Sequence, residues 1–468
     1  MRHTNEHGWN HIIPSEITPQ AVYEGRRDWM KRLAAGALGT GLAGWAARDA
    51  LAADSAAKGA VLAGAKSAVA GAVTLDKPTP RADAVSYNNF YANLVVPAGA
   101  TASLNADSRV DMYGTLSGAG TLNFFIPYIR TDLYTDWSAF TGIINVLSDA
   151  GGGNFRMATS YSFPGFPRAA IALTDNVSAY YTGTLSAGAG TTIEIGELSG
   201  TVLSGLKGGA TGGRNFTYRI GGRNTDAVFA GTIAEQNTGT TTSFVKTGTG
   251  TWTLGGTCNW NGGLTVELGT LKISGSVTCG AAVNVAPPAG YTSALVFAGG
   301  TLHSDAVNFS SGTTFTGNGT IDGDLNVSTG AMVTCGTGTL AVTRDVVNNG
   351  TMRFTGGATL NATGSFVNNG VLDLLTGAQG LPANLINNGA VIDSSSLSQA
   401  QASQNGTTFT VKVRTYAGHA YQLQRAISLT APTWTDVGTP QTGDGSVRDF
   451  IDTGATGAQR FYRVLLTP

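Results

Sequence analysis

Apolar and polar residues alternate along most of this chain. From residue 95 onward, apolar side chains recur at every second position, and glycine or asparagine interrupts the pattern after a few residues, as in 121–126 (TLNFFI) and 192–195 (TIEI). A period of two predicts β-strands, and the interruptions predict turns. Between residues 95 and 394 the pattern shows no convincing helix of three turns. Residues 138–148 (SAFTGIINVLS) fit both periods, but their flanks favour a strand.

An internal repeat organises the later strands. The triplet Asn-Asn-Gly begins at Asn348, Asn368 and Asn387, and each triplet precedes a short apolar strand. The spacing is close to the roughly 20 residues that one coil of a solenoid uses, whereas Asn-Gly hairpin turns would recur about every ten residues. The repeat therefore predicts a parallel β-helix. We expect its glycines to adopt positive φ at a corner and its asparagines to hydrogen-bond along the axis.

A second repeat carries a family resemblance. Residues 246–256 (KTGTGTWTLGG) and 261–271 (NGGLTVELGTL) together resemble the autotransporter-associated β-strand repeat, and residues 123–233 resemble the segment that leads into it. That repeat occurs in surface-exposed and secreted bacterial proteins, so the resemblance implies an all-β, right-handed parallel β-helix, here over residues 95–394. The core-facing side chains that it implies are Trp252, Leu254, Val266 and Leu271.

The composition agrees with strands and turns. Of the 468 residues, 66 are glycine, and charged residues make up 12%, about half of the usual share in soluble proteins. Amphipathic helices would need more lysine, glutamate and arginine than this. The formal net charge of −1 gives no electrostatic reason to expect a nucleic-acid partner.

The three cysteines predict neither a metal site nor a cofactor. Cys258, Cys279 and Cys335 lie in glycine-rich repeats, and none has a second cysteine or a histidine at the spacing of a metal site. Cys258 and Cys279 are about one coil apart. We expect them at equivalent positions, where they would form either a stack of two thiols or a disulfide.

The N-terminus has the pattern of an export signal. Residues 25–31 (GRRDWMK) contain the paired arginines Arg26 and Arg27 of a twin-arginine signal. A weakly apolar stretch follows at 33–45, too short to span a membrane, and Ala-Leu-Ala at 50–52 offers a cleavage site. We predict a twin-arginine signal peptide over residues 1–53 and a final location in the periplasm, at the cell surface or outside the cell.

The segment after the signal carries a second resemblance. Residues 17–23 (ITPQAVY), the twin arginines and residues 77–91 (KPTPRADAVSYNNFY) resemble the leader of the catalytic subunit of the periplasmic protein-methionine-sulfoxide reductase, a molybdopterin oxidoreductase. The resemblance covers about residues 10–91. The resemblance implies that Asn88 and Tyr91 contact the cofactor. That family continues with glutamate where this chain has Ala92, and it holds molybdenum through a cysteine in a domain that nothing further along this chain resembles. We interpret residues 54–94 as a linker and leader remnant.

The C-terminal residues predict a separate module. A polar run at 395–406 is typical of a linker. Strand-like alternation then resumes over 407–468, and the segments 421–425 (YQLQR), 434–438 (WTDVG) and 461–464 (FYRV) resemble a small β-sandwich of secreted bacterial proteins. The resemblance implies carbohydrate contact, surface retention or sorting. Because the chain ends shortly after this motif, we expect no integral membrane barrel.

Parallel β-helices often cleave acidic polysaccharides, and the chain carries fragments of that chemistry. The motif Asn-Thr-Asp at 224–226 matches one element of pectin hydrolases, but their Asp-Asp, Gly-His-Gly and Arg-Ile-Lys motifs are missing. A lyase needs a basic residue and usually carboxylates for calcium, and exposed aromatic rings can stack on sugars. The candidate ligand contacts are Arg219, Arg223, Asp226, Tyr134 and Trp137.

The sequence favours an exported, non-enzymatic β-helix that is adhesin-like, structural or bound to a polysaccharide or cell-surface glycan. A polysaccharide lyase or hydrolase of the β-helix type is the alternative. A molybdopterin-dependent methionine sulfoxide reductase is a third reading, supported by the leader alone. A groove with convergent arginine and aspartate side chains would favour an enzyme over a binding protein.

Overall fold

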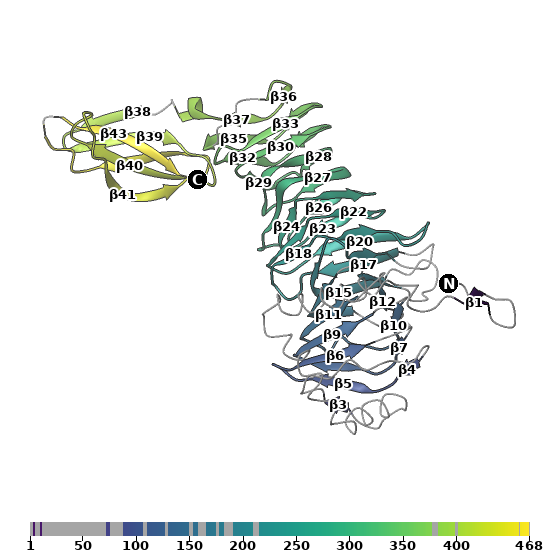
Figure 1. Ribbon diagram of the computed structural model, residues 1–468. Coiled ribbons are helices and arrows are strands. Elements are labelled where there is room, and N and C mark those ends of the chain that lie inside the picture. The colour runs from purple at the N-terminus through teal and green to yellow at the C-terminus, as the bar shows by residue number, and fades with distance from the viewer. Residues whose placement is uncertain are drawn as a thin grey trace.

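The computed structural model describes residues 88–467 apart from short gaps, together with three short strands before them (Figure 1). The early strands are β1 (His3–Thr4), β2 (Asn10–His11) and β3 (Ala72–Thr74). The gaps are residues 106–109, 127–129, 149–152, 158–164, 175–176, 182–190, 209–214, 377–381, 398–400 and 458. Arg26, Arg27 and the cleavage site of the predicted signal lie outside the described residues.

Most of the described chain coils into a parallel β-helix with three faces, which we call A, B and C. Each regular coil contributes one strand to each face in that order, and each strand pairs in parallel with its equivalent in the next coil. Two long strands, β27 (Ser293–Phe309) and β28 (Thr313–Val327), bend around all three faces. Parallel pairing confirms the predicted solenoid and excludes the hairpin meander.

The strands of the three faces have the following bounds. Two strands turn from face A to face B, namely β13 (Gly165–Leu173) and β15 (Thr191–Gly200). Face A also contains β5 (Asn93–Val96), β8 (Leu116–Gly118), β17 (Asn215–Ile220), β20 (Thr241–Lys246), β23 (Leu264–Val266), β26 (Val283–Val285), β31 (Val346–Asn348), β34 (Phe366–Asn368) and β36 (Leu385–Asn387). Face B contains β6 (Thr101–Asn105), β9 (Thr121–Phe125), β11 (Ile143–Leu147), β18 (Ala227–Phe229), β21 (Thr251–Leu254), β24 (Gly269–Ile273), β29 (Met332–Cys335), β32 (Thr351–Thr355), β35 (Val371–Thr376) and β37 (Ala390–Ile392). Face C contains β4 (Asn88–Phe90), β7 (Val110–Met112), β10 (Arg130–Leu133), β12 (Gly153–Met157), β14 (Val177–Tyr181), β16 (Gly205–Lys207), β19 (Thr232–Ala234), β22 (Thr257–Trp260), β25 (Ser276–Cys279), β30 (Thr339–Val342) and β33 (Thr359–Ala362).

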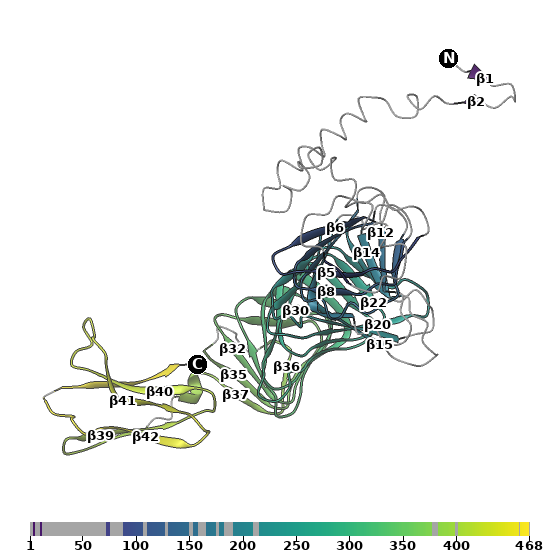
Figure 2. The ribbon, with the colours of Figure 1, turned by 90° about the horizontal axis from the view of Figure 1, so that it is seen from below.

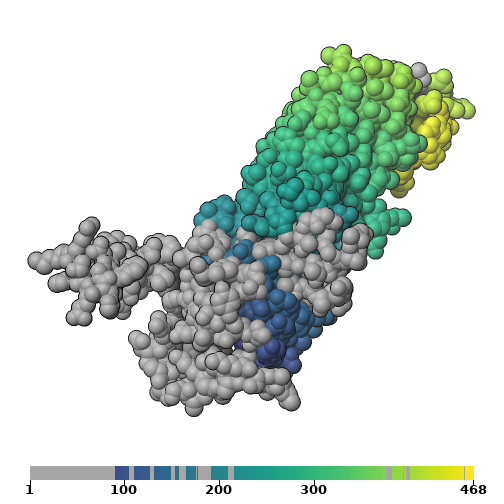
Figure 3. Space-filling view, turned by 90° about the vertical axis from the view of Figure 1, so that its right-hand side faces the viewer, coloured from purple at the N-terminus to yellow at the C-terminus, as the bar shows by residue number. Residues whose placement is uncertain are grey.

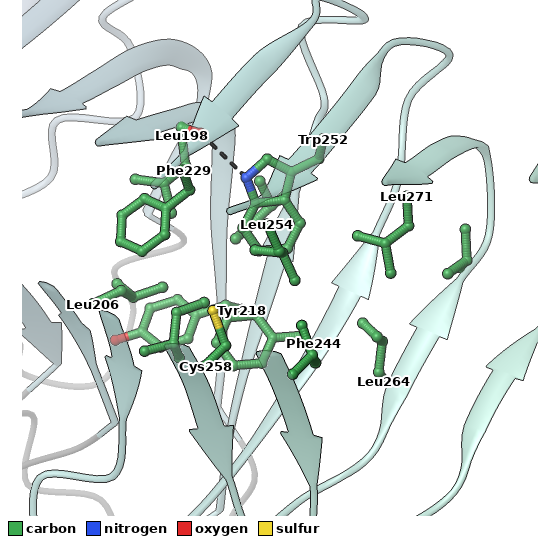
Figure 4. Close-up of a cluster of buried hydrophobic side chains, with 14 of the residues drawn as sticks. Leu198, Leu206, Tyr218, Phe229, Phe244, Trp252, Leu254, Cys258, Leu264 and Leu271 are labelled. Atoms are coloured by element: carbon green, nitrogen blue, oxygen red, sulfur yellow. Dashed lines mark hydrogen bonds between the residues drawn. The ribbon is translucent and has the colours of Figure 1, made fainter. Parts of the chain in front are cut away.

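The interior is a continuous apolar core because alternate side chains of every strand point inward. Trp252, Leu254, Val266 and Leu271 are at most 2% exposed, as predicted, and Figure 4 shows three of them in one cluster. The indole of Trp252 donates to the carbonyl of Leu198 at 3.2 Å, so its polar atom is satisfied. Each fully buried large side chain contributes about 1.5–3 kcal/mol, which explains why the alternation persists through so many coils.

The Asn-Asn-Gly repeat forms two hydrogen-bonded ladders along one corner. In the inner ladder, Asn348 Nδ2 donates to Asn368 Oδ1 at 2.8 Å, and Asn368 Nδ2 donates to Asn387 Oδ1 at 2.7 Å. The second asparagine of each triplet stacks outside it, with distances of 2.9 and 3.0 Å. The predicted ladder is confirmed.

The glycines of these triplets are required for a different reason from the predicted one. Gly350, Gly370 and Gly389 do not adopt positive φ. Instead, a Cβ on Gly370 would lie 1.9 Å from the carbonyl oxygen of Gly350, and a Cβ on Gly389 would lie 2.0 Å from that of Gly370. Successive coils approach so closely at this corner that no side chain fits between them.

The cysteines do not stack as predicted. Cys258, Cys279 and Cys335 are free and buried. Cys258 is aligned with Val277, and Cys279 is aligned with Trp260, so the two thiols are offset along the strands and form no disulfide. Burial raises the pKa of the Cys258 thiol to about 12 and also raises the pKa of the other two thiols.

The C-terminal region is a sandwich of two antiparallel sheets. One sheet contains β38 (Gln401–Asn405), β39 (Thr408–Arg414) and β42 (Val447–Asp452), and the other contains β41 (Thr435–Thr442), β40 (Ala420–Ala426) and β43 (Phe461–Thr467). Their inner faces share a small apolar core, made of Val411, Val413, Tyr421, Leu423 and Phe450. The sandwich lies beside the last coils (Figures 1 and 2), at one end of an elongated body (Figure 3).

The linker prediction fails over part of its length. A short 3-10 helix (η2, Ser394–Leu397) follows the last coil, and β38 then pairs with β39 along its whole length. All five residues of β38 are exposed and mostly polar. A polar segment can form a strand when a neighbouring strand pairs with it. The composition of residues 395–406 does not indicate that such a partner exists.

Candidate functional site on face B

Face B presents a regular row of outward side chains. Thr251 of β21 is aligned with Thr270 of β24, and two residues further along the same strands Thr253 is aligned with Lys272. Neighbouring strands of a sheet lie about 4.8 Å apart, so these side chains repeat at that interval along the solenoid axis. Asp226 precedes β18 in the coil before, and its Oδ1 accepts a hydrogen bond from the Thr251 backbone N–H at 2.6 Å.

These side chains line a concavity of about 480 Å³ on the outer surface. The polar lining consists of three threonines, one carboxylate and one ammonium group. Apolar surface comes from Val228, which is 55% exposed, and from Val296. A shallow surface with hydroxyls beside small apolar patches can bind a hydroxyl-rich chain by hydrogen bonds and by contact with its C–H faces. The lining residues are Asp226, Ala227, Val228, Thr251, Thr253, Thr270, Lys272 and Val296.

Arg219, one of the predicted contacts, is directed elsewhere. It lies on β17 of face A, where its Nη2 forms an ion pair with Glu267 at 2.7 Å and donates to the Thr247 hydroxyl at 3.1 Å. Its Nε lies 4.0 Å from Glu194. Arg219 thus links three coils of face A and does not belong to the face B concavity.

Arg223, the second predicted arginine, bridges stacked turns. It lies at the corner between faces A and B, and its Nη1 donates to the carbonyls of Thr141, Gly142 and Arg168 at 2.8, 3.2 and 3.1 Å. Its Nε lies 3.8 Å from Glu197. One guanidinium therefore satisfies the carbonyls of turns that are 55 to 82 residues away in sequence. Of the predicted Arg219, Arg223 and Asp226, only Asp226 lines the concavity.

The Asn-Thr-Asp motif is a structural corner. Asn224 adopts a φ of 63°, and its Oδ1 accepts from the Thr249 backbone N–H at 2.9 Å. The hydroxyl of Thr225 donates to Glu197 at 2.5 Å. Each residue of the motif therefore contacts a neighbouring coil, and the resemblance to the pectin hydrolases goes no further than these three letters.

The two aromatic candidates have different environments. Trp137 is fully buried, and its indole donates to the Gly114 carbonyl at 2.9 Å, so its prediction as a ligand contact was wrong. It belongs to the core because its ring packs against those of Phe124, Phe155 and Phe166. Tyr134 is 37% exposed and stacks on Tyr113, which stacks on Tyr91, with ring centroids 4.9 and 5.0 Å apart. Stacking covers one face of the Tyr134 ring and both faces of the Tyr113 ring.

Lys246, which the sequence reading did not single out, is buried at the end of β20, at the corner that leads from face A to face B. Its ammonium donates to the carbonyls of Thr247 and Gly248 at 2.8 Å and of Leu268 at 2.9 Å. Burial lowers the pKa of Lys246 to about 8, although the charge of Asp226 acts in the opposite direction. Because each of the three N–H groups has a carbonyl partner, the Lys246 ammonium has a structural role: it links the backbone of two successive coils at this corner.

The far end of face B carries a buried ionic network under the sandwich. One oxygen of Asp373 accepts hydrogen bonds from Arg353 Nε at 2.9 Å and from His419 Nε2 at 2.6 Å. The same guanidinium donates to the carbonyls of Ala417 and Gly418 at 2.8 and 2.9 Å. Arg353 and Asp373 come from the solenoid, and His419 comes from the sandwich loop between β39 and β40. The network therefore fixes the sandwich on face B.

The residues implied by the reductase leader do not fit a molybdenum cofactor. Asn88 lies on β4 and pairs with Val110, and Tyr91 stacks on Tyr113. The cysteines are thiols buried inside the solenoid, whose raised pKa opposes the thiolate form that a metal needs. In the described part of the chain, no three His, Cys, Asp or Glu side chains are grouped to hold a metal ion.

The fold defines a parallel β-helix protein with a C-terminal β-sandwich. No protein-family model matches the chain. A stretch of 80 residues, 17% of the chain, is 46% identical to the protein-methionine-sulfoxide reductase catalytic subunit of Ralstonia nicotianae and spans 23% of that protein. The similarity therefore extends to less than a quarter of the relative. Over the residues that the structure describes, no helix has the length and hydropathy of a membrane span.

Proposed function

We propose that this protein is exported and acts outside the cytoplasm as a non-enzymatic β-helix, adhesin-like in its role, that binds a polysaccharide or cell-surface glycan along face B. The observation that carries the proposal is the concavity of about 480 Å³ lined by Thr251, Thr253, Thr270, Asp226 and Lys272. The parallel strands align Thr251 with Thr270 and Thr253 with Lys272 along the solenoid axis, so the polar groups form an extended surface that suits a chain-like ligand. One carboxylate and one ammonium nearly cancel, so a neutral polysaccharide fits better than an acidic one.

The positions of the two predicted arginines favour binding over cleavage, because neither side chain lines the concavity. A lyase or hydrolase needs an acid or base that faces the substrate without a competing partner. The two predicted arginines have carboxylate and carbonyl partners away from the concavity. Export is supported by the twin arginines, Arg26 and Arg27, and by the resemblance to the reductase leader, and fractionation of the source cells tests it.

Binding is tested with the full chain and a panel of immobilised polysaccharides, namely cellulose, xylan, pectin and alginate. The variant Thr251→Val/Thr253→Val/Thr270→Val removes three hydroxyls. Because each hydrogen bond is worth about 0.5–1.5 kcal/mol, we expect at least a tenfold loss of affinity for the neutral polymers. The control, Thr339→Val/Thr359→Val, removes two hydroxyls that bond to each other on face C at 2.7 Å, and it should bind normally.

Three results would contradict the proposal. One is an equal loss of binding in the face B and face C variants. Another is that the unaltered chain binds none of the polysaccharides. The third is shortening of the bound polysaccharide, measured by the size of the polymer after incubation, which would establish the enzymatic alternative.

A further inference from the structure

The C-terminal sandwich is closed along one side and open along the other. On the closed side, β41 and β42 follow each other in sequence and lie in contact. On the open side the two sheets end in β38 and β43, and within the described residues these two strands pair with nothing beyond β39 and β40. Each of them thus presents one free edge toward the same opening.

An apolar cavity of about 310 Å³ lies in this opening. Tyr462, Val464 and Leu466 alternate along β43 and face it, and they remain partly exposed although they point into the sandwich. Phe409 stacks on Tyr462 with ring centroids 3.9 Å apart, and Ala402 of β38 adds only a methyl group. In the closed half of the same core, Leu423 and Phe450 are at most 2% exposed. The open side of the core therefore receives no large apolar side chain from β38.

The free edge of β38 lacks the features that usually prevent pairing. Edge strands are commonly protected by lysine, proline, a bulge or a covering segment. β38 has the sequence QASQN, carries no charge, and pairs with β39 without a register shift. Backbone donors and acceptors at a free edge, next to pockets for alternate side chains, are what an added β-strand recognises.

The charges at this side indicate an acidic occupant. Arg463 stacks over Trp434 at 4.3 Å and donates to Gln424, and Arg460 donates to the Thr456 carbonyl. Neither guanidinium forms an ion pair with a carboxylate among the described residues. An acidic side chain on an added strand would complement both.

We propose that the open side of the sandwich binds an extended segment of another protein chain, which adds as a strand between β38 and β43. Its apolar side chains, at alternate positions, fill the 310 Å³ cavity, and its acidic residues face Arg460 and Arg463. The sandwich then acts as an attachment module that holds the solenoid on a protein partner, which differs from glycan binding on face B.

The test uses the full chain and a fluorescently labelled synthetic nonapeptide with valine and phenylalanine alternating with threonine and one aspartate at each end. We expect saturable binding by fluorescence anisotropy, together with hydrogen-exchange protection of β38 and β43 but not of face B. The variant Ala402→Trp fills the cavity from within, so it should keep or raise the melting temperature and weaken peptide binding at least tenfold. A peptide with lysine in place of aspartate should bind several-fold more weakly at low salt.

Three results would overturn the proposal. Equal peptide binding by the Ala402→Trp variant would place the peptide elsewhere. Absence of binding and protection, with the sandwich folded, would mean that the opening accepts no strand. Concentration-dependent dimerisation of the unaltered chain that Ala402→Trp abolishes, without peptide binding, would identify a second copy of this chain as the occupant.

Discussion

Two stretches of face B occupy the same outward row of the solenoid and have opposite environments. Thr251 and Thr270 lie in the open concavity, whereas Arg353 and Asp373, further along the row, are at most 8% exposed. The strand register connects these positions through each intervening coil. The alternation along a strand therefore determines whether a side chain points into the core or outward. Whether an outward side chain is exposed to solvent depends on what packs over it.

The comparison also shows how the two stretches tolerate polar groups. In the open stretch, solvent hydrates the hydroxyls and Lys272, so their removal costs the fold little. Under the sandwich, one carboxylate accepts hydrogen bonds from a guanidinium and an imidazole, and two loop carbonyls accept one hydrogen bond from each terminal nitrogen of the guanidinium. Buried charges of this kind are costly when one partner is removed.

The largest effect is expected from Asp373→Asn. The substitution leaves Arg353 and His419 buried without an anion, so the interface between sandwich and solenoid should weaken by about 3–5 kcal/mol. Hydrogen exchange of the loop at residues 415–419 measures this loss. The matched control is Asp449→Asn, whose carboxylate lies 3.6 Å from Lys412 with both side chains nearly half exposed. It should change stability by less than about 1 kcal/mol. Similar protection in both variants would show that the network does not hold the interface.

A smaller, graded loss of stability at the interface between sandwich and solenoid is expected when the pH is lowered. Burial opposes ionisation of Asp373, but hydrogen bonds from His419 and Arg353 outweigh it and hold the pKa of the carboxyl below its usual value. A carboxyl with a depressed folded pKa contributes stability that is complete above the unfolded pKa, near 3.9, and is lost as the pH falls through the folded pKa. Loop protection should thus be constant from pH 7 to about 5 and decline below pH 4. The same decline in Asp373→Asn would assign it to other carboxyls.

The smallest effect on stability is expected in the open stretch. Thr251→Val/Thr253→Val/Thr270→Val changes solvated hydroxyls on strands that favour β-branched residues. The free energy of unfolding, measured by urea denaturation, should change by less than about 0.5 kcal/mol per site. A loss of several kcal/mol would mean that these hydroxyls are structural. Weaker binding by this variant could then result from unfolding and would not support the proposed glycan site.

Much of the fold could be predicted from local patterns. The resemblance to the autotransporter-associated repeat implied the inward positions Trp252 and Leu271. The ladder of Asn348 and Asn368 followed from the spacing of the triplets, because each coil repeats one set of contacts with its neighbour. The candidate site was predicted less well. Only Asp226 of the five predicted contacts lines the concavity, because residues close in sequence, such as Arg219 and Arg223, turn to different faces at a corner. The threonines of face B were missed although they alternate with the predicted core residues.

The sequence by itself determined the coil, since apolar alternation and a repeat of about 20 residues leave the chain few other ways to bury its side chains. The Asn-Asn-Gly triplets also marked a corner of the coil, but the close approach that requires their glycines appeared only in the structure. Only the tertiary structure decided the offset of Cys258 from Cys279, the burial of Arg353 and Asp373, and the open side of the sandwich. These features depend on register and on contacts between segments far apart in the chain, which no local pattern contains.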